Sequence, residues 1–166
     1  MNKVLLGIDP GTRGNMGVSI WRMVEQEETL LAVRYYSIND IFRTIDRYIY
    51  DGCTLIVAIE TQYLNPKNLK GLFRLAEVKG AIEYYARYKG AEVILVNPER
   101  VRQMLRLKRG TRRKEKKKAA VHLVKLLYGY DFTDREDLAD AVLIGRWAIK
   151  EIQRKQEKQN ANQARK

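Results

Sequence analysis

Short apolar runs, each broken by glycine, proline or charged residues, predict five strands along the chain. The first run is almost entirely apolar and stops at Pro10-Gly11, which is typical of a central strand buried on both faces. A charged turn at residues 25–28 separates the second and third runs, so the first three strands are expected to form a meander. The five predicted strands are residues 3–9, 15–21, 29–36, 54–60 and 91–96.

Apolar residues at helical spacing fill the segments between and after the later strands. Asn65-Pro66 and Asn97-Pro98 each place a cap residue before a proline, which is typical of a helix start. Because strands four and five are each reached through a helix, we expect them to lie parallel to the first strand. The pattern predicts an α/β layer fold with a mixed sheet. The predicted helices are residues 38–50, 65 to about 89, a segment from 97 onward, 119–128, and 134 to about 153.

The length of 166 residues suits one domain, and the chain shows no internal repeat or linker. We expect the domain to cover residues 1–155, and residues 156–166 to be a disordered polar tail, because they are polar without periodicity. The chain has no apolar run long enough to cross a membrane, and its first residues lack the features of a signal peptide. The single cysteine, Cys53, is expected to be a reduced, packed thiol in a cytoplasmic protein.

The composition narrows the chemistry that the chain can perform. One cysteine and one histidine, His122, leave little room for a zinc site of the Cys/His kind or for Ser-His-Asp catalysis. Lysine and arginine number 32 against 20 acids, a net charge of +12. Such a charge repels itself unless a polyanion offsets it, and the cations are concentrated in residues 106–118. The charge alone leaves several partners open: DNA, ribosomal RNA or a membrane surface would each fit, as would a solvated basic face with no polyanion partner.

Two acidic residues stand where charge is poorly tolerated, because Asp9 and Glu60 each end an apolar strand. If the two strands pair in parallel, these carboxylates meet at one edge of the sheet, with the strands about 4.8 Å apart. Two anions at that distance repel each other unless a cation or a proton lies between them. The alternative is that each acid only caps the turn that follows its own strand.

The last predicted helix adds two more acids. Asp137 and Asp140 are three residues apart and share a helical face, and Asp140 also lies on the apolar stripe that should pack inward. Asp134 is expected to be the N-cap of this helix. Asp137 would then lie at the third helical position, where the helix dipole stabilises its carboxylate even without a metal ion. Carboxylate-only ligands suit Mg²⁺ or Mn²⁺, and two such ions about 4 Å apart can hydrolyse a phosphodiester.

Three short blocks of the chain resemble the RuvC family of Holliday-junction resolvases in their order and spacing. They are Gly7-Ile8-Asp9-Pro10-Gly11, then Ala58-Ile59-Glu60 with Tyr63, and Asp137-Leu138-Ala139-Asp140-Ala141. The resemblance covers Val4 to about Ala148. It implies an RNase H-like fold of the retroviral integrase superfamily, with a five-stranded mixed sheet flanked by helices. It also implies a homodimer, in a bacterial or phage-infected cell, whose two active sites cut opposed strands of a four-way DNA junction.

The resemblance further implies roles for individual residues. Asp9, Glu60, Asp137 and Asp140 fall at the positions of the family's metal ligands, which implies that they hold two Mg²⁺ or Mn²⁺ ions in each active site.

 
Lys117, with Lys114 near it, falls near the family's lysines that approach the scissile phosphate. Tyr63 falls where the family often has an aromatic residue that contacts DNA at the crossover.

The long helix after Pro66 resembles the dimer helix of the family, on the residues Leu72, Leu75, Ala76, Lys79-Gly80 and Ile82. The segments 65–74 and 106–118 are more basic than is usual for the family. In this respect the chain resembles the compact viral members more than the cellular ones, which favours broader cutting of branched DNA. Tyr84, Tyr85 and Tyr88 are expected to pack at helical spacing rather than stack on bases. The expected DNA contacts are Tyr63, Lys67, Lys70, Arg74, Lys108, Arg109, Arg112, Arg113, Lys114 and Lys117.

Three other functions fit parts of the sequence. An RNase H-like enzyme acting on RNA or on general branched DNA would use the same acids and metals. An ATP-using protein of the actin and sugar-kinase class would share the first phosphate loop, but such proteins need a duplicated domain, and this chain is too short. A non-catalytic junction-binding module would gain nothing from four acids that face DNA. No segment of the sequence identifies a helicase partner.

Overall fold

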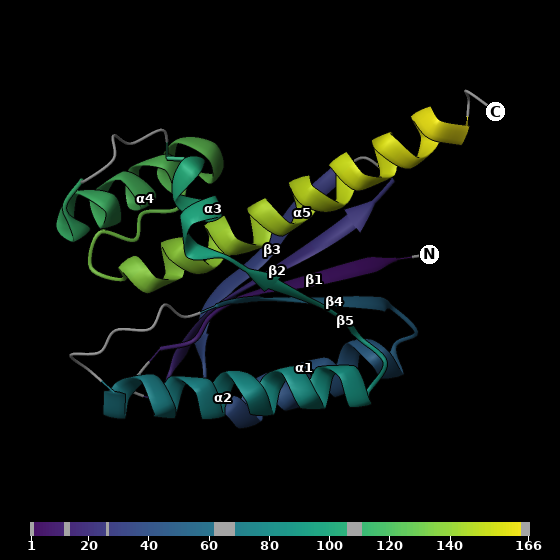
Figure 1. Ribbon diagram of the computed structural model, residues 1–166, viewed down its shortest axis with the longest axis horizontal. Coiled ribbons are helices and arrows are strands. Elements are labelled where there is room, and N and C mark those ends of the chain that lie inside the picture. Colours follow the sequence, from purple (N-terminus) through teal and green to yellow (C-terminus); the bar gives the residue numbers. More distant parts are fainter. Residues whose placement is uncertain (1, 12–13, 26, 62–68, 106–110, 164–166) are drawn as a thin grey trace.

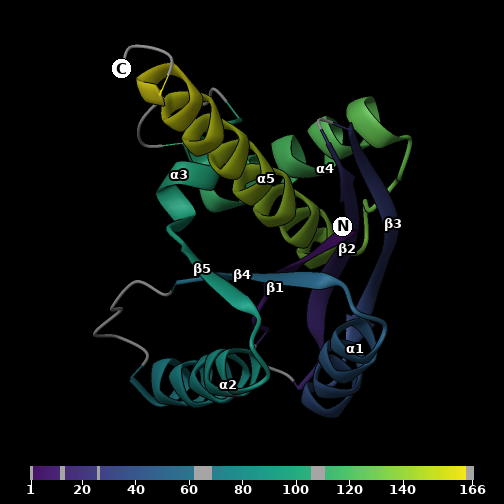
Figure 2. The same cartoon turned by 90° about the vertical axis from the view of Figure 1, so that its right-hand side faces the viewer.

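The computed structural model describes residues 2–11, 14–25, 27–61, 69–105 and 111–163. A five-stranded mixed sheet lies between two layers of helices (Figure 1). Helices α1 and α2 cover one face of the sheet, and α3, α4 and α5 lie on the other, as the view turned by 90° also shows (Figure 2). The predicted fold class is thereby confirmed.

The sheet has the strand order β3-β2-β1-β4-β5. The first three strands are antiparallel neighbours, whereas β4 is parallel to β1 and β5 is parallel to β4. The hairpin between β2 and β3 is longer than the sequence predicted, because its ladder continues through the charged residues that were expected to form a wide turn. The strands are β1 (Lys3–Asp9), β2 (Met16–Val24), β3 (Glu27–Tyr36), β4 (Thr54–Glu60) and β5 (Glu92–Val96).

Local signals in the sequence account for most of the helix boundaries. Ser37 forms a capping box with Asp40 at the start of α1, and Asn97 caps α3 directly before Pro98, as predicted. The predicted cap at Asn65-Pro66 lies outside the described residues. The helices are α1 (Ile38–Tyr50), α2 (Leu69–Tyr88), α3 (Pro98–Gln103), α4 (Arg113–Tyr128) and α5 (Glu136–Gln163).

Two helices are longer than their apolar patterns indicated. Helix α4 begins at Arg113, six residues before the predicted start, because the Glu115 side chain accepts a hydrogen bond from the Arg112 backbone at 3.2 Å and lysine favours helix. Helix α5 continues to Gln163, through the segment that was expected to be disordered. Once a helix exists, each added residue closes a further hydrogen bond, so a polar segment of good helix formers can extend it. No helix in the described ranges is long and apolar enough to cross a membrane.

Alternate residues of the central strands divide the core into two parts. Val4, Leu6 and Ile8 face α1 and α2, and Leu5 faces the other layer together with Trp21. Cys53 is half-buried and is a free thiol.

Helix α5 lies unusually close to β1 and β2, because glycines line the contact. A methyl group at Gly17 would lie 2.5 Å from the Asp137 carbonyl oxygen, and one at Gly145 would overlap the indole of Trp21. Ser19 is the one buried polar side chain among the described residues, and it donates a hydrogen bond of 2.7 Å to the Ala141 carbonyl oxygen. The indole nitrogen of Trp21 donates to the Ser19 hydroxyl at 2.9 Å. This contact fixes the height of α5 above the sheet.

Candidate metal centre

Asp9 and Glu60 lie at the ends of two neighbouring parallel strands. The register pairs Ile8 of β1 with Ile59 of β4, so the next residue of each strand is an acid at the same edge. Both side chains are half-buried, and each follows a run of buried residues. The sequence-based prediction that the two carboxylates meet at one edge agrees with this register.

Helix α5 carries two further acids to the same edge. Asp9, Asp137 and Asp140 each offer a carboxylate oxygen, and these oxygens lie within 4.8 Å of one another. The close approach of α5 at Gly17 brings Asp137 down to the end of β1. Glu60 stands outside this group of three but interacts electrostatically with both Asp9 and Asp140.

Burial and mutual repulsion make the charged forms of these acids unfavourable. Burial, followed by the neighbouring charges of Glu60 and Asp140, holds the pKa of Asp9 well above its usual range. Burial and then Asp140 raise the pKa of Glu60 to about 7. Burial also raises the pKa of Asp140, against the opposing effect of Lys117. A cation placed among the acids would remove the cost of keeping them all ionised.

Lys117 of α4 already supplies one positive charge to the cluster. Its ammonium group donates a hydrogen bond of 2.8 Å to Asp137 and a shorter one to Asp140. Burial opposes the charge on Lys117, but Asp140 and the two hydrogen bonds outweigh burial and raise the pKa of the lysine. Lys117 therefore ties α4 to α5 and partly neutralises the two acids of α5.

The acids line a cleft of about 480 Å³ with a cationic rim. Arg113, Lys116 and Lys117 line it from α4, where their spacing of three and four residues puts them on one helical face. Arg102 of α3 lines the cleft too and opposes the rise in the pKa of Glu60. Arg102 and Lys116 were not among the expected DNA contacts. A predicted start of α4 at residue 113 instead of 119 would have put Lys116 on one helical face with Arg113 and Lys117.

The structure separates the other expected DNA contacts into distinct groups. Lys114 is exposed and does not line the cleft, in contrast to Lys117. Arg74 on α2 and Arg112 before α4 are exposed, and Asp134, the expected cap, lies in a turn two residues before α5 begins. Tyr63, Lys67, Lys108 and Arg109 lie outside the described residues, as does the side chain of Lys70.

Comparison with known proteins places the fold. No protein-family model and no curated protein matches the chain. Among solved structures, Thermus thermophilus RuvC in complex with a Holliday junction substrate matches with a TM-score of 0.64 and 22% identity, over 88% of this chain and 93% of RuvC. The fowlpox virus resolvase in complex with Holliday junction DNA matches with a TM-score of 0.56 and 15% identity, over 90% and 98% of the two chains. The yeast mitochondrial Holliday junction resolvase matches with a TM-score of 0.50 and 13% identity, over 87% and 77%. The chain shares the RNase H-like fold of these resolvases.

Proposed function

We propose that the protein is a metal-dependent endonuclease that resolves four-way DNA junctions. The observation that carries the proposal is the convergence of Asp9, Asp137 and Asp140, whose oxygens lie within 4.8 Å of one another in a cleft rimmed by cations. A fold shared with resolvases from a bacterium, a virus and a mitochondrion supports the assignment. An acidic centre inside a strongly basic chain is the charge distribution that phosphodiester hydrolysis requires.

The donor set fits a hard divalent cation. The gathered groups are carboxylates, and the cleft contains no histidine or cysteine among its described lining residues. Asp9, Asp137 and Asp140 would hold one Mg²⁺ or Mn²⁺ ion, and Glu60 with Asp9 would hold a second. The bound ions would activate a water and stabilise the leaving oxygen.

The chain's own cations would bind and orient the substrate. Lys117 lies against two of the acids, so its ammonium is within reach of a phosphate placed at the metal centre. Arg113 and Lys116 extend the positive charge along the rim of the cleft and would hold the phosphates on either side of the cut. Contacts of this kind position the backbone without reading bases, which favours recognition of DNA by shape.

The metal hypothesis predicts that Mn²⁺ stabilises the folded protein. At a concentration about 100 times its Kd, an ion that binds only the folded state adds about 2.7 kcal/mol. For a chain of this size, that corresponds to a rise in Tm of roughly 5–10 °C. Thermal unfolding with and without Mn²⁺ measures the shift, which Asp140→Asn should largely remove. Asp134→Asn, an exposed acid on the same segment, is the matched control, and an equal shift in both variants would contradict the site.

We also propose that α2 joins two copies of the chain. Phe73, Tyr84 and Tyr88 are 66%, 72% and 73% exposed. Ala76 and Gly80 are exposed on the same stripe, since 76, 80, 84 and 88 are each four residues apart, and their small size would let a second helix approach closely. Two active sites in one symmetric dimer would account for cuts on opposed strands.

The exposed stripe on α2 differs in part from what the sequence predicted for the residues of this helix. Ile82, one of the residues on which the resemblance to the dimer helix rests, is fully buried in the core. Of the three tyrosines expected to pack, Tyr85 stacks on Phe42 with ring centroids 4.2 Å apart, whereas Tyr84 and Tyr88 are largely exposed. Phe73, Tyr84 and Tyr88 therefore lie on the outward face of the helix, whereas Tyr85 and Ile82 lie on its inward face.

Gly80→Glu should convert the dimer to a monomer. A Cβ atom at Gly80 would meet no heavy atom within 4 Å among the described residues beyond the adjoining helix backbone, and Gly80 is exposed, so the fold should tolerate the substitution. The new carboxylate would, however, lie in the middle of the joined helices. Light scattering after size-exclusion chromatography should give the mass of one chain instead of two. Asn39→Glu on α1 is the control for an added exposed charge. A Gly80→Glu variant that stays dimeric would remove α2 from the interface.

A cleavage assay on defined substrates tests the proposed function. A mobile four-way junction, a linear duplex, a branched flap and a hairpin RNA are incubated with Mg²⁺ or Mn²⁺, and the products are mapped on every strand. Symmetric cuts on two opposed junction strands support resolution. Equal cutting of the flap or of the RNA would favour the alternative of a broader RNase H-like nuclease with the same metals.

A further inference from the structure

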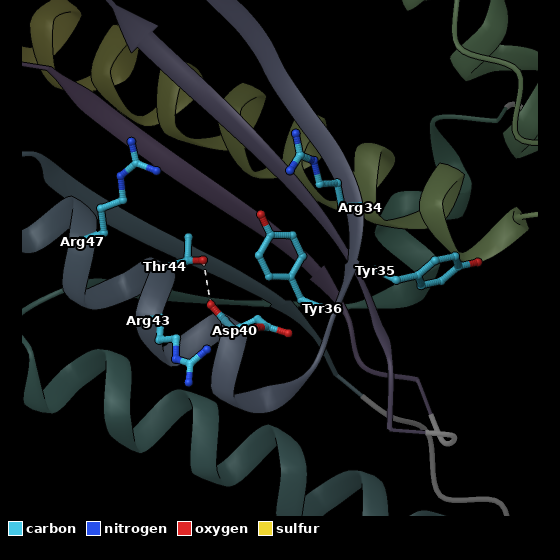
Figure 3. Close-up of a pocket in the computed structure, with 7 residues that line it drawn as sticks. All are labelled: Arg34, Tyr35, Tyr36, Asp40, Arg43, Thr44 and Arg47. Atoms are coloured by element: carbon cyan, nitrogen blue, oxygen red, sulfur yellow. Dashed lines mark hydrogen bonds between the residues drawn. The ribbon is translucent and has the colours of Figure 1, made fainter.

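A second hollow, of about 380 Å³, lies between the end of β3 and helix α1 (Figure 3). Three arginines line it, Arg34 from β3 and Arg43 and Arg47 from α1. Arg43 and Arg47 are four residues apart and therefore share one face of the helix. With Asp40 as the one acid among the lining residues, the hollow carries an excess of positive charge.

The charge of Asp40 acts on Arg43, but the Asp40 carboxylate is also held in the cap of α1. The Asp40 carboxylate accepts hydrogen bonds from the Ser37 hydroxyl at 2.6 Å and from the Ser37 backbone at 3.1 Å. The Thr44 hydroxyl donates to the Asp40 carbonyl oxygen at 2.7 Å. These bonds belong to the cap and first turns of α1, so they cannot be given up without loosening the helix.

The arginines themselves keep most of their donors available. Arg47 meets Asp51 at 3.9 Å, and both side chains are at least half exposed, which makes this ion pair weak. Within the described part of the chain, no hydrogen bond or ion pair engages Arg34 or Arg43. Guanidinium groups present their donors in a planar fork that matches the oxygens of a phosphate. The hollow therefore has the chemistry of a phosphate site.

Successive side chains at the end of β3 face opposite sides of the sheet, one toward the hollow and the next toward the acids. Arg34 and Tyr36 project from β3 toward α1, and Tyr35 between them projects to the opposite side (Figure 3). On that side Tyr35 is close enough to the acids for Asp137, after burial, to raise the pKa of its phenol. The sheet register pairs Asp9 with Gly17 and Gly17 with Tyr35, so the hollow and the acids lie at the same end of the sheet, two strands apart and on opposite faces.

We propose that this hollow, the arginine site of Arg34, Arg43 and Arg47, binds backbone phosphates of a duplex arm that leaves the metal centre across the edge of β3. The inference rests on the proposed function and deepens it, because it gives the substrate a second contact away from the cut. Phosphate binding there would be independent of sequence. The contact should strengthen binding only for arms long enough to pass the edge strand.

Binding as a function of arm length and salt tests the arginine site. The Arg43→Gln/Arg47→Gln variant and its parent are compared on junctions with short and long arms, in Ca²⁺ so that no strand is cut. With long arms the variant should bind about tenfold more weakly, and its slope of log K against log salt should fall by about two. With short arms the two proteins should bind alike. The control is Lys155→Gln/Lys158→Gln, which removes the same charge from the exposed end of α5. In this control the salt slopes for long and short arms should differ as much as they do in the parent.

The outcomes separate this inference from the proposed function. Equal affinities and slopes for variant and parent on every arm length would overturn the arginine site, while cutting of junctions by the parent would leave the nuclease assignment intact. A parent that neither binds nor cuts junctions would overturn both. Calorimetric titration with a nucleoside triphosphate tests whether the hollow binds a small ligand instead. The assignment to DNA would be overturned if the parent bound the nucleotide saturably, the variant did not, and junction binding showed no dependence on arm length.

Discussion

Asp9→Asn should abolish cleavage of a four-way junction while the junction remains bound at least as tightly as by the parent protein. Asp9 is the acid that the cluster shares, since its oxygen lies within 4.8 Å of those of Asp137 and Asp140 and it also interacts with Glu60. The substitution would remove several kcal/mol of the stabilisation that bound metal gives to the transition state. Because each 1.36 kcal/mol corresponds to a factor of ten in rate, the reaction would slow by at least about a thousandfold. Removing one anion from a cleft that faces DNA favours binding.

Single-turnover cleavage and equilibrium binding, measured on the same junction, check the two halves of this prediction. Asp134→Asn is again the matched control, because it removes the same charge from an exposed turn close to the site. Its cleavage rate should equal that of the parent. If Asp9→Asn cuts at the parental rate, the catalytic centre lies elsewhere, whatever the affinity for DNA.

Gly145→Ala should both destabilise the protein and reduce cleavage, although Gly145 lies outside the cluster of acids. The added methyl group would overlap the indole of Trp21 and approach the Ser19 hydroxyl at 2.9 Å, so α5 must shift away from the sheet. Overpacking of this kind costs about 1–3 kcal/mol. Since α5 carries Asp137 and Asp140, a displacement of less than an ångström would misplace two of the acids, and such errors can slow catalysis by about a hundredfold.

Thermal unfolding together with cleavage at a temperature where the variant is folded separates the two effects. Asn160→Ala is the control for stability, because Asn160 also lies in α5 but is exposed on the polar half of the helix. It should be neutral or stabilising by up to about 1 kcal/mol. A Gly145→Ala variant that is less stable but cuts normally would show that the acids tolerate movement of α5.

The strands and the first two acids were predictable from the sequence because simple rules fix them. Apolar runs marked β1 and β4, and a helical connection between parallel strands placed Asp9 and Glu60 at one edge of the sheet. Asp140 was predictable because it interrupts an apolar stripe on α5. In each case the signal was a charge at a position where the pattern demanded an apolar residue.

The cationic partners were harder to predict because they depend on how helices pack. Arg102 reaches the cleft only because α3 lies beside α5, and no spacing along the chain indicates this. The polar half of α5 had no apolar pattern to reveal a helix. The arginine site joins residues of β3 and α1 whose side chains come together only in the folded protein.

The order of the acids along the chain bears on when the protein can act. Asp9 and Glu60 are synthesised early, whereas Asp137 and Asp140 are carried by the last helix. A growing polypeptide therefore holds only two of the four proposed metal ligands until the ribosome has passed residue 140, and the last helix must then dock against the sheet. The proposed metal centre is therefore completed only when the last helix has been made and docked, so a chain that ends before residue 137 lacks half of the acids.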